Sequence, residues 1–565
     1  MGSMPDREHL DEVDVLIVGS GPIGAVFART LVSAGRSVVM IDVGDQGTRR
    51  IGDHRKNSVA VQKDISLFSH TVRASLLNGD LHPLSVSTNA TDSGLEPGSW
   101  SSKPAQTQFL YNGQNPEQQA SDNLPAAAAS RVVGGMSGHW TNCTPRQNKT
   151  LERSDLFSDE EWNALYARAE DLFWTDDNLL DDSIRQQLVK KVLGDAFEDR
   201  GREIASMPMC GRRGLQNRDY VEWACTATIL GDLAEPCARN ARFELRANTQ
   251  CVRLEMDPVT RQVELAQVED LLENRKYGIK ANKYVICAGA VLTAGILWNS
   301  GGLRETIPAL GRYIVDQPMS FCQVLLDQKH IDAVTHDEYQ LGWKRAVTHH
   351  KGKHPNDPLP LPFNDPDPQC YFPPCEDYPW HAQIHRDAFG YGQIPGIIDQ
   401  RVVLDLRWYG YTKPSEENCV EFSADVTDGF GMPQASTPTF HFKMNEEDSD
   451  RASRMMSDMV DVAQNLGAFL PGAEPKHLPP GSAMHLCGTY RAGQAKVDEE
   501  TGEGSVVDRL GRVWGQDDLV LGGCGVIPTQ SACNPTITAA AFALAAADQI
   551  VEDLDGVKAR KLELM

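Results

Sequence analysis

Apolar and polar positions near the start of the chain change period in a regular order. A short apolar run at 15–18 enters the spacing Gly19-x-Gly21-x-x-Gly24, and apolar positions at helical spacing follow it. A second apolar run occupies 38–41. This order predicts a buried strand, a glycine turn, an amphipathic helix and a second strand.

Each glycine in the turn has a physical task that suits a dinucleotide. Gly19 allows a tight turn, Gly21 allows a pyrophosphate to approach the backbone, and Gly24 allows the helix to pack closely on the strand. The helix N-terminus offers free N–H groups to phosphates. Asp42 ends the second strand, where a carboxylate can accept the ribose hydroxyls of an unphosphorylated adenosine. The pattern predicts an adenine dinucleotide site; without a ligand it would be only a tight turn.

The rest of the chain alternates between regular and irregular patterns. Residues 60–130 are polar and rich in turn residues, which is typical of a surface excursion, an interface arm or a lid. Residues 151–200 have helical spacing, and 243–290 alternate as strands. Proline is so dense in 350–380 that we expect a loop or small insertion with no regular element. Residues 511–550 return to the order strand, glycine turn and helix.

Composition narrows the possible partners. A chain of 565 residues is too long for one simple core, so we expect at least two domains. The net charge of −24, without a basic stripe, argues against nucleic-acid binding and favours a small neutral or cationic substrate. No apolar run is long enough to span a bilayer and no signal peptide is recognisable, so we expect no membrane partner and a cytoplasmic or other intracellular location. The thirteen scattered cysteines, with no C-x-x-C pair, predict free thiols and no metal site.

A second glycine segment precedes a histidine. Gly134-Gly135-Met136-Ser137 provides flexible backbone that can lie against a flat ring. His139 follows directly, and on its residue type alone it could be a nucleophile, a hydrogen-bond donor or a structural residue.

Together these segments resemble the glucose–methanol–choline (GMC) flavoprotein oxidoreductases, and among them the pyranose oxidases. The similar strings include VGSGPIGAVFARTLVSAG from Val18, RVVGGMSGHWT from Arg131, WHAQIHRDAFGYG from Trp380, LGGCGVIPT from Leu521 and NPTITA from Asn534. They occur in the family's order and cover nearly the whole chain.

The resemblance implies an α/β fold, with a Rossmann-like FAD-binding domain and a second α+β sheet domain for the substrate. The expected FAD-binding segments are 10–60, 131–304 with a helical insertion, and 481–555; 61–130 is an extended arm or oligomerisation segment; and 305–480 is the substrate domain, including the proline-rich insertion at 350–380. The family's tetramer implies a homo-oligomer, a tetramer or a dimer, for this chain.

The resemblance also implies FAD as cofactor, bonded covalently through its 8α-methyl carbon to His139. The alternative is that His139 only packs or hydrogen-bonds and FAD dissociates. Thr141 matches the threonine that faces flavin N5. The remaining implied FAD contacts are Gly19, Gly21, Gly24, Asp42, Arg131, Gly134, Gly135, Met136, Ser137, Cys251, Ala288, Gly523, Cys524, Asn534 and Thr536.

A substrate loop is implied by the similarity of residues 383–392. Gln383, Asp387 and Arg407 match polar residues on the substrate side, and Phe389 and Tyr391 would form an apolar wall. A glycine-flanked loop over a flavin suits a reaction that needs a dry site. Asp387 with a neighbouring arginine could instead be a structural ion pair.

The family oxidises a secondary alcohol, with a histidine taking the hydroxyl proton, an asparagine holding the same oxygen, and dioxygen becoming hydrogen peroxide. Asn534 matches the asparagine, but Tyr490 stands in the GTHRMG-like string where the histidine is expected. The ordinary pKa of tyrosine lies about 3.5 above that of histidine, so tyrosine is a poor base and a competent acid. A nearby cation such as Arg491 could depress the pKa of Tyr490. Alternatively His485 could supply the base, although the family carries a histidine there too, which favours a structural role.

These observations give one leading function and two rivals. The leading expectation is FAD-dependent oxidation of a secondary alcohol on a sugar, glycoside or hydroxylated natural product, with dioxygen as acceptor. The first rival is a biosynthetic flavoenzyme that desaturates, eliminates or isomerises a non-sugar substrate, for which Tyr490 is the supporting feature. The second is a flavin-binding protein without catalysis.

Overall fold

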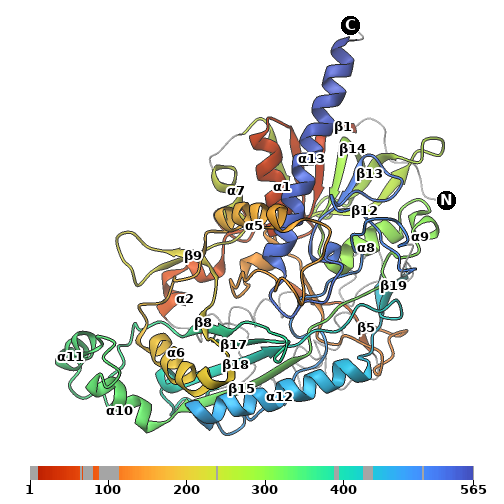
Figure 1. Ribbon diagram of the computed structural model, residues 1–565. Helices are drawn as coiled ribbons and strands as arrows, with labels where there is room; N and C mark the ends of the chain where they lie inside the picture. The colour runs from red at the N-terminus through yellow and green to blue at the C-terminus, as the bar shows by residue number, and fades with distance from the viewer. Residues whose placement is uncertain are drawn as a thin grey trace.

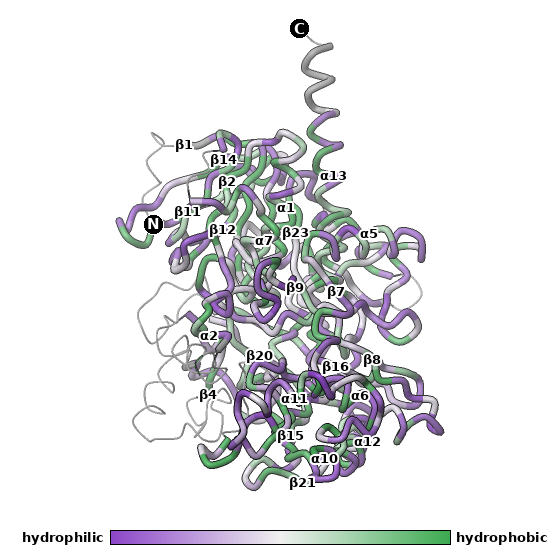
Figure 2. Tube along the Cα trace, turned by 90° about the vertical axis from the view of Figure 1, so that its left-hand side faces the viewer, coloured by the Kyte–Doolittle hydropathy of each residue, from purple (hydrophilic) through white to green (hydrophobic). Residues whose placement is uncertain are grey.

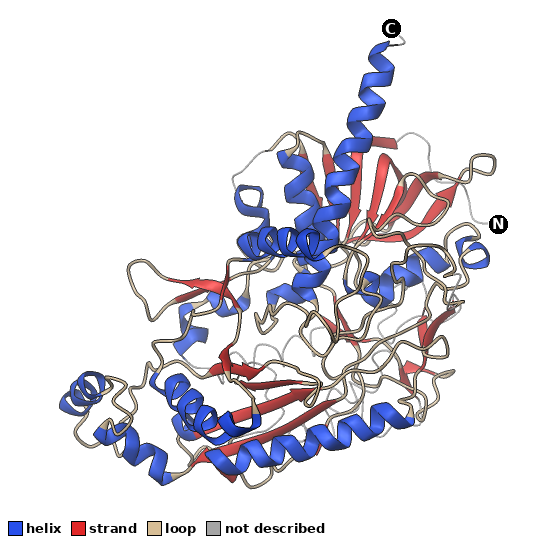
Figure 3. Ribbon diagram, viewed as in Figure 1, coloured by secondary structure: helices blue, strands red, loops and turns tan. Residues whose placement is uncertain are grey.

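A computed structural model describes residues 10–63, 67, 80–87, 114–236, 240–386, 394–423, 437–498 and 502–563. The described chain is built around two sheets with helices packed on them (Figures 1 and 3). Figure 2 shows the apolar segments gathered inside the body and the polar segments along the outer loops.

The first sheet confirms the predicted Rossmann-like fold. Its strands, in spatial order, are β11 (Phe243–Arg246), β2 (Val38–Ile41), β1 (Leu10–Val18), β14 (Arg275–Ile286), β13 (Val263–Asp270) and β12 (Thr249–Met256), with β23 (Leu519–Leu521) paired to the end of β14. The pairings β11–β2, β2–β1, β1–β14 and β14–β23 are parallel, and β13 and β12 pair antiparallel beside them. The long twelve-residue β14 thus joins the N-terminal and C-terminal segments of the chain in one sheet.

Helices from distant parts of the sequence cover this sheet. They are α1 (Pro22–Ser33), α5 (Asp159–Phe173), α7 (Thr226–Leu230), α8 (Ala290–Trp298) and α13 (Thr536–Glu563). The Tyr166 hydroxyl on α5 lies 2.9 Å from the Thr538 hydroxyl on α13. The buried alanines of α13 let its first half pack closely, whereas its C-terminal end extends beyond the body (Figure 1).

The second sheet is antiparallel throughout. Its order is β21 (Gly467–Phe469), β15 (Met319–Leu326), β18 (Val403–Tyr409), β17 (His381–His385), β16 (Gln369–Phe372) and β8 (Ala205–Ser206), and β22 (Lys476–His477) also pairs with β15. The helices α6 (Ile184–Phe197) and α12 (Glu446–Leu466) bury apolar side chains against it, while α10 (Gln328–His336) and α11 (Lys344–Lys353) lie at one end (Figure 1).

Part of the range predicted for the FAD-binding domain packs with the second sheet instead. Both α6 and β8 fall within 131–304, yet α6 packs its apolar side chains against the second sheet and β8 is one of the strands of that sheet. Arg202, just before β8, forms a buried ion pair with Asp458 on α12. The helical pattern of 151–200 is confirmed as α5 and α6, but its second helix serves the other sheet.

The proline-rich range 350–380 contains more regular structure than predicted. The end of α11 and the strand β16 lie within it, so the expectation of no regular element is wrong. The strand fits because Gln369–Phe372 contains no proline, although Pro368 precedes it and Pro373 follows.

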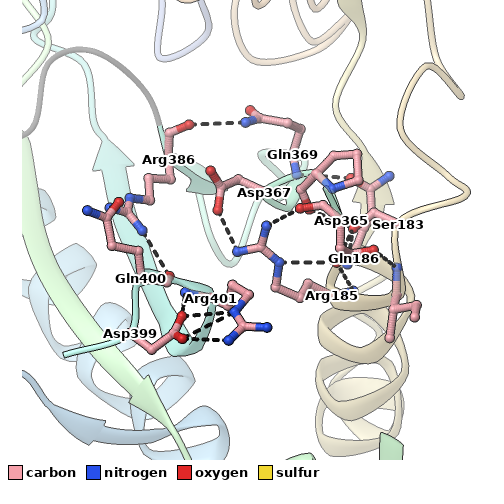
Figure 4. A network of polar contacts seen from close by, with 12 residues as sticks. Ser183, Arg185, Gln186, Asp365, Asp367, Gln369, Arg386, Asp399, Gln400 and Arg401 are labelled. Carbon is pink, nitrogen blue, oxygen red and sulfur yellow. Dashed lines mark hydrogen bonds and ion pairs between the residues drawn. The ribbon is translucent and has the colours of Figure 1, made fainter. Parts of the chain in front are cut away.

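A polar network joins α6 to the segment that enters β16 (Figure 4). Arg185 pairs with Asp365 at 3.1 Å and with Asp367 at 2.7 Å, and the Asp365 pair is buried on both sides. Asp365 also accepts the backbone N–H of Ile184 at the start of the helix, at 2.7 Å. Nearby, Arg386 at the end of β17 donates to Gln400 Oε1 at 2.7 Å.

Parts of the predicted arm are packed inside the chain. The pairs β3 (Leu81–Pro83) with β6 (Ala128–Ser130), and β4 (Val86–Ser87) with β5 (Gln114–Asn115), are short two-stranded sheets. Buried Asn115 donates to Pro438 O on β20 (Thr437–His441), which pairs with β19 (Cys419–Ser423). A role of this arm in oligomerisation stays a prediction.

Two further properties concern the described part of the chain. Its cysteines are all free, which confirms the predicted thiols. None of its helices combines the length and apolar character needed to cross a bilayer.

Candidate functional site

A cavity of about 340 Å³ extends from the first glycine turn to the second sheet. Gly19, Gly21 and Asp42 line it at one end, while Arg407 and His485 line it at the other. This volume falls within the range of small-molecule sites, and both sheets contribute to the lining.

Sterics explain the spacing of the first glycine turn. Gly19 has a φ of +101°, and a Cβ there would lie 2.4 Å from Cys287 O. A Cβ on Gly24 would lie 2.1 Å from Gly19 O. At Gly21, by contrast, a Cβ would meet nothing within 4 Å, because this glycine faces the cavity. The open space lies at the start of α1, where backbone N–H groups and the helix dipole favour a phosphate.

Asp42 links the end of β2 to this turn. Its Oδ2 accepts Ser20 N at 2.8 Å and Ser20 Oγ at 2.7 Å, and its Oδ1 accepts Gly44 N at 2.8 Å. Burial raises the pKa of Asp42, and these bonds oppose that rise. Because a carboxylate offers about four acceptor sites, roughly one remains for a ribose hydroxyl.

The second glycine segment abuts the first. Gly134 and Gly135 have φ values of +98° and +55°, and a Cβ on Gly135 would lie 3.0 Å from Gly21 Cα. Gly134 N donates to Ser20 Oγ at 2.9 Å. The following one-turn helix Gly135–Gly138 therefore starts beside the first turn, and Met136 and Ser137 line the cavity.

His139 follows this short helix and is fully buried. Burial lowers its pKa to about 3, so the imidazole is neutral. Within the described residues, neither ring nitrogen has a hydrogen-bond partner. Buried polar groups without partners are rare and costly in native proteins. Ser137 and Trp140 on either side line the cavity, so the ring lies next to the space for a bound group, although it is not itself part of the lining. The glycine turns and this unpartnered imidazole therefore fit FAD.

His485 and Asn534 meet at the other end of the cavity and both line it. His485 Nε2 lies 3.4 Å from Asn534 Nδ2, and His485 Nδ1 lies 2.8 Å from Gln317 Oε1. Asn534 Oδ1 accepts Gln383 Nε2 at 2.9 Å. Burial lowers the pKa of His485 to about 4, so this imidazole is also neutral at pH 7.

Tyr490 lies outside the cavity lining. Its fully buried hydroxyl donates to Gly522 O at 3.0 Å, and burial raises its pKa. A Cβ on Gly525 would lie 2.2 Å from the Tyr490 ring, so the ring fills the space under the glycine turn. Arg491 pairs with Glu503 instead of depressing the Tyr490 pKa. These positions correct the expectation that Tyr490 reaches the substrate oxygen. They make His485 the candidate base, although the sequence favoured a structural role for it.

The other predicted residues divide between the lining and its support. Gly24, Gly134, His139 and Gln383 lie behind the cavity lining. Asp387, Phe389 and Tyr391 lie outside the described residues. The remaining predicted residues on the lining are Arg131, Thr141, Cys251, Ala288, Gly523, Cys524 and Thr536, together with Arg407, which pairs with Asp405 at 3.3 Å.

Sequence reasoning missed Gln317 and Glu152. Gln317 contacts His485, and Glu152 accepts the backbone N–H groups of Ala532 and Cys533 just before Asn534. Neither residue belongs to a recognisable motif, so the sequence carried no signal for them.

Similarity to known proteins agrees with this site. The sequence profile described as GMC oxidoreductase matches residues 414–543. The chain is 40% identical to a pyranose 2-oxidase of Lyophyllum shimeji, over 97% of this chain and 93% of the relative. It is 30% identical to a C-glycoside 3-oxidase of Arthrobacter globiformis, over 96% of this chain and 95% of the relative.

The fold has solved counterparts as well. A formate oxidase structure superposes with a TM-score of 0.60 at 14% identity, covering 96% of this chain and 99% of the other. The chain belongs to the GMC oxidoreductase family, and it is an FAD-dependent oxidoreductase that acts on CH–OH donors.

Proposed function

We propose that the protein oxidises a secondary alcohol of a pyranose sugar or glycoside, with dioxygen as electron acceptor and hydrogen peroxide as product. The observation that carries the proposal is the pair His485 and Asn534, which presents a neutral imidazole and an amide side by side on the cavity. The names of the relatives, pyranose 2-oxidase and C-glycoside 3-oxidase, support a sugar or glycoside as substrate.

The pair suits proton removal from a hydroxyl. His485 Nε2 takes the hydroxyl proton as a general base, and Asn534 Nδ2 donates a hydrogen bond to the same oxygen. With these atoms 3.4 Å apart, one substrate oxygen can lie against both. Removal of the proton raises electron density on the oxygen and helps the carbon to release a hydride. FAD, when bound, supplies the hydride acceptor.

The opposite end of the cavity retains the cofactor in this proposal. The glycine turns receive the pyrophosphate, and the remaining acceptor site of Asp42 receives the ribose. We infer that a nitrogen of His139 would hold FAD covalently at the flavin 8α carbon, in place of one methyl hydrogen; that hydrogen would leave as a proton, and the two electrons would pass to the flavin ring and then to dioxygen. The neutral, unpartnered imidazole supports this bond, because a protonated ring could not act as nucleophile.

Desaturation, elimination or isomerisation of a non-sugar substrate was the first rival. It relied on Tyr490 acting as an acid in the site. Since the Tyr490 hydroxyl donates to Gly522 O away from the cavity lining, no observation favours that rival.

A substrate screen tests the proposal. The purified flavoprotein is incubated with pyranoses, with O- and C-glycosides and with non-sugar alcohols, while peroxide release is measured. We expect turnover on at least one pyranose or glycoside, and identification of the ketone separates oxidation at carbon 2 from oxidation at carbon 3. His485→Asn should lose at least about 100-fold in kcat. The exposed His336→Asn on α10 should keep the wild-type rate. Turnover confined to non-sugar alcohols would overturn the proposed substrate class.

A further inference from the structure

We propose that Gln317 is a positioning residue that fixes the direction of the hydrogen bonds around His485 and Asn534. It leaves His485 Nε2 without a proton and turns the amide N–H of Asn534 toward the substrate. Gln317 is buried two residues before β15 and is not on the cavity lining. The inference rests on the proposed function, in which His485 is the base.

The orientation of the Gln317 amide follows from two backbone carbonyls. One end of the amide lies 2.8 Å from Ser531 O and 2.7 Å from Cys533 O. Carbonyl oxygens only accept, so this end must be the NH₂ group, with one hydrogen for each carbonyl. The other end is therefore the oxygen, and it lies 2.8 Å from His485 Nδ1. Nδ1 must carry the imidazole proton, and Nε2 keeps its lone pair.

The protonation of His485 in turn fixes the orientation of the Asn534 amide. Since His485 Nε2 is an acceptor, the atom facing it at 3.4 Å must be the amide nitrogen of Asn534. Asn534 Oδ1 then faces Gln383, which donates from Nε2 at 2.9 Å. The second Gln383 hydrogen points to His381 Nδ1 at 3.0 Å. A reversed Gln317 amide would place its oxygen against the carbonyl oxygens of Ser531 and Cys533. It would also exchange donor and acceptor in the hydrogen bonds that join Gln317 to His485 and His485 to Asn534.

Gln317 also holds the loop that carries Asn534. Its NH₂ group binds the carbonyls of Ser531 and Cys533, while Glu152 Oε1 accepts Ala532 N at 2.5 Å and Cys533 N at 3.1 Å from the other side. Both side chains therefore fix the same loop, but only Gln317 also contacts His485. Glu152→Gln is thus a matched control, because it perturbs the loop without touching the imidazole.

Several titratable groups surround His485. The Tyr409 ring on β18 lies 5.9 Å from the imidazole centroid, His381 lies on β17, and Cys487 Sγ lies 3.3 Å from His485 O. Asp316 precedes Gln317, and burial raises its pKa. Burial and the nearby His485 lower the pKa of His381 to about 3. A carboxylate introduced at position 317 would be closer to the imidazole N–H than these side chains.

The experiment compares Gln317→Glu, Gln317→Met and Glu152→Gln in the flavin-loaded enzyme. Two readouts are used: the pH profile of kcat/KM with the best sugar, and a pH titration of the flavin absorption spectrum without substrate. Gln317→Glu keeps an acceptor for Nδ1–H and, once its carboxyl group is ionised, adds a charge that favours the imidazolium, while its second oxygen loses the two hydrogen bonds to Ser531 O and Cys533 O. We expect both midpoints on the acid side to rise by about one to three pH units.

Gln317→Met should lower kcat at least about tenfold while KM stays within about threefold, because the proton then distributes over both ring nitrogens. Glu152→Gln should leave both midpoints at the wild-type pH.

Each outcome decides the proposal. If Gln317→Glu leaves both midpoints unchanged, or Glu152→Gln moves them equally, Gln317 is only a structural residue and the proposal fails. If Gln317→Met does not fold, the midpoints of Gln317→Glu still carry the test. If the wild-type protein oxidises no sugar but the spectral midpoint rises in Gln317→Glu, the positioning role stands and the proposed function fails.

Discussion

The protonation of His485 sets the acid limit of turnover in this account. Only the neutral imidazole can take a proton, and burial lowers its pKa from 6.5 to about 4. Activity should therefore be constant above about pH 5 and fall as the pH drops through about 4. At pH 5.5 a group of pKa about 4 is still roughly 97% neutral, whereas an ordinary histidine would be only about 9% neutral. The lowered pKa thus predicts about a tenfold difference at this pH.

The assay is kcat/KM for the best sugar between pH 3.5 and pH 8, at constant ionic strength and fixed oxygen. We expect kcat/KM at pH 5.5 to lie within about 10% of the plateau, and its acid midpoint to lie near pH 4. His485→Asn should be low at every pH without that midpoint. A midpoint near 6.5 in the wild type would refute the reasoning, because it would mean that the base is a solvated histidine.

Four further predictions address other parts of the molecule. The acid-precipitated wild-type protein should stay yellow and His139→Ala should release free FAD; a colourless wild-type pellet would reject the covalent bond. Tyr490→Phe should cost about 1 kcal/mol of unfolding free energy, for one lost hydrogen bond, and keep kcat within about threefold; a loss near that of His485→Asn would restore Tyr490 to the site. Asp365→Ala should lower the unfolding free energy by about 3 kcal/mol in urea titrations, because it leaves Arg185 buried beside Asp367 alone; an unchanged urea midpoint would contradict this. Folding lowers the pKa values of His139, His381 and His485, so the unfolded state takes up protons first as the pH falls. The urea concentration at the unfolding midpoint should therefore decrease as the pH is lowered from 6.5 toward 4; an increase would contradict the buried neutral state.

The first glycine turn could be predicted because its glycine spacing belongs to one strand–turn–helix unit, although the atom nearest a Cβ on Gly19 is Cys287 O beyond the neighbouring strand. The lack of space for a Cβ at Gly19 and Gly24 follows from contacts within the strand–turn–helix unit and its neighbouring strand. Asp42 was predictable for the same reason, because it ends the strand next to that turn. The spacing of Gly19, Gly24 and Asp42 along the sequence therefore indicates the geometry of this turn directly.

The far end of the cavity could not be predicted in this way. His485 and Tyr490 lie five residues apart in an irregular segment, where no strand or helix period decides which side chain faces inward. The similarity of a short string favoured Tyr490, whereas tertiary packing buries its ring under Gly525. Gln317 contacts His485 across 168 positions of sequence, a separation over which no pattern of apolar residues carries information.

The strand β16 shows a related limit. Prolines at 366 and 368 rightly exclude regular structure before Gln369, but four residues between prolines suffice for a strand when a neighbour is available. The neighbours β17 and β8 come from separate parts of the chain. Proline density therefore predicts the breaks in this segment better than its pairing.

Anaerobic rapid mixing of the flavoprotein with pyranoses and glycosides tests whether His485 drives sugar oxidation, because bleaching of the flavin reports the reductive step alone. We expect at least one of these sugars to bleach the flavin, and bleaching in His485→Asn, at equal flavin content, to be at least about 100-fold slower. Absence of bleaching by every pyranose and glycoside, or bleaching of His485→Asn at the wild-type rate, would contradict this expectation.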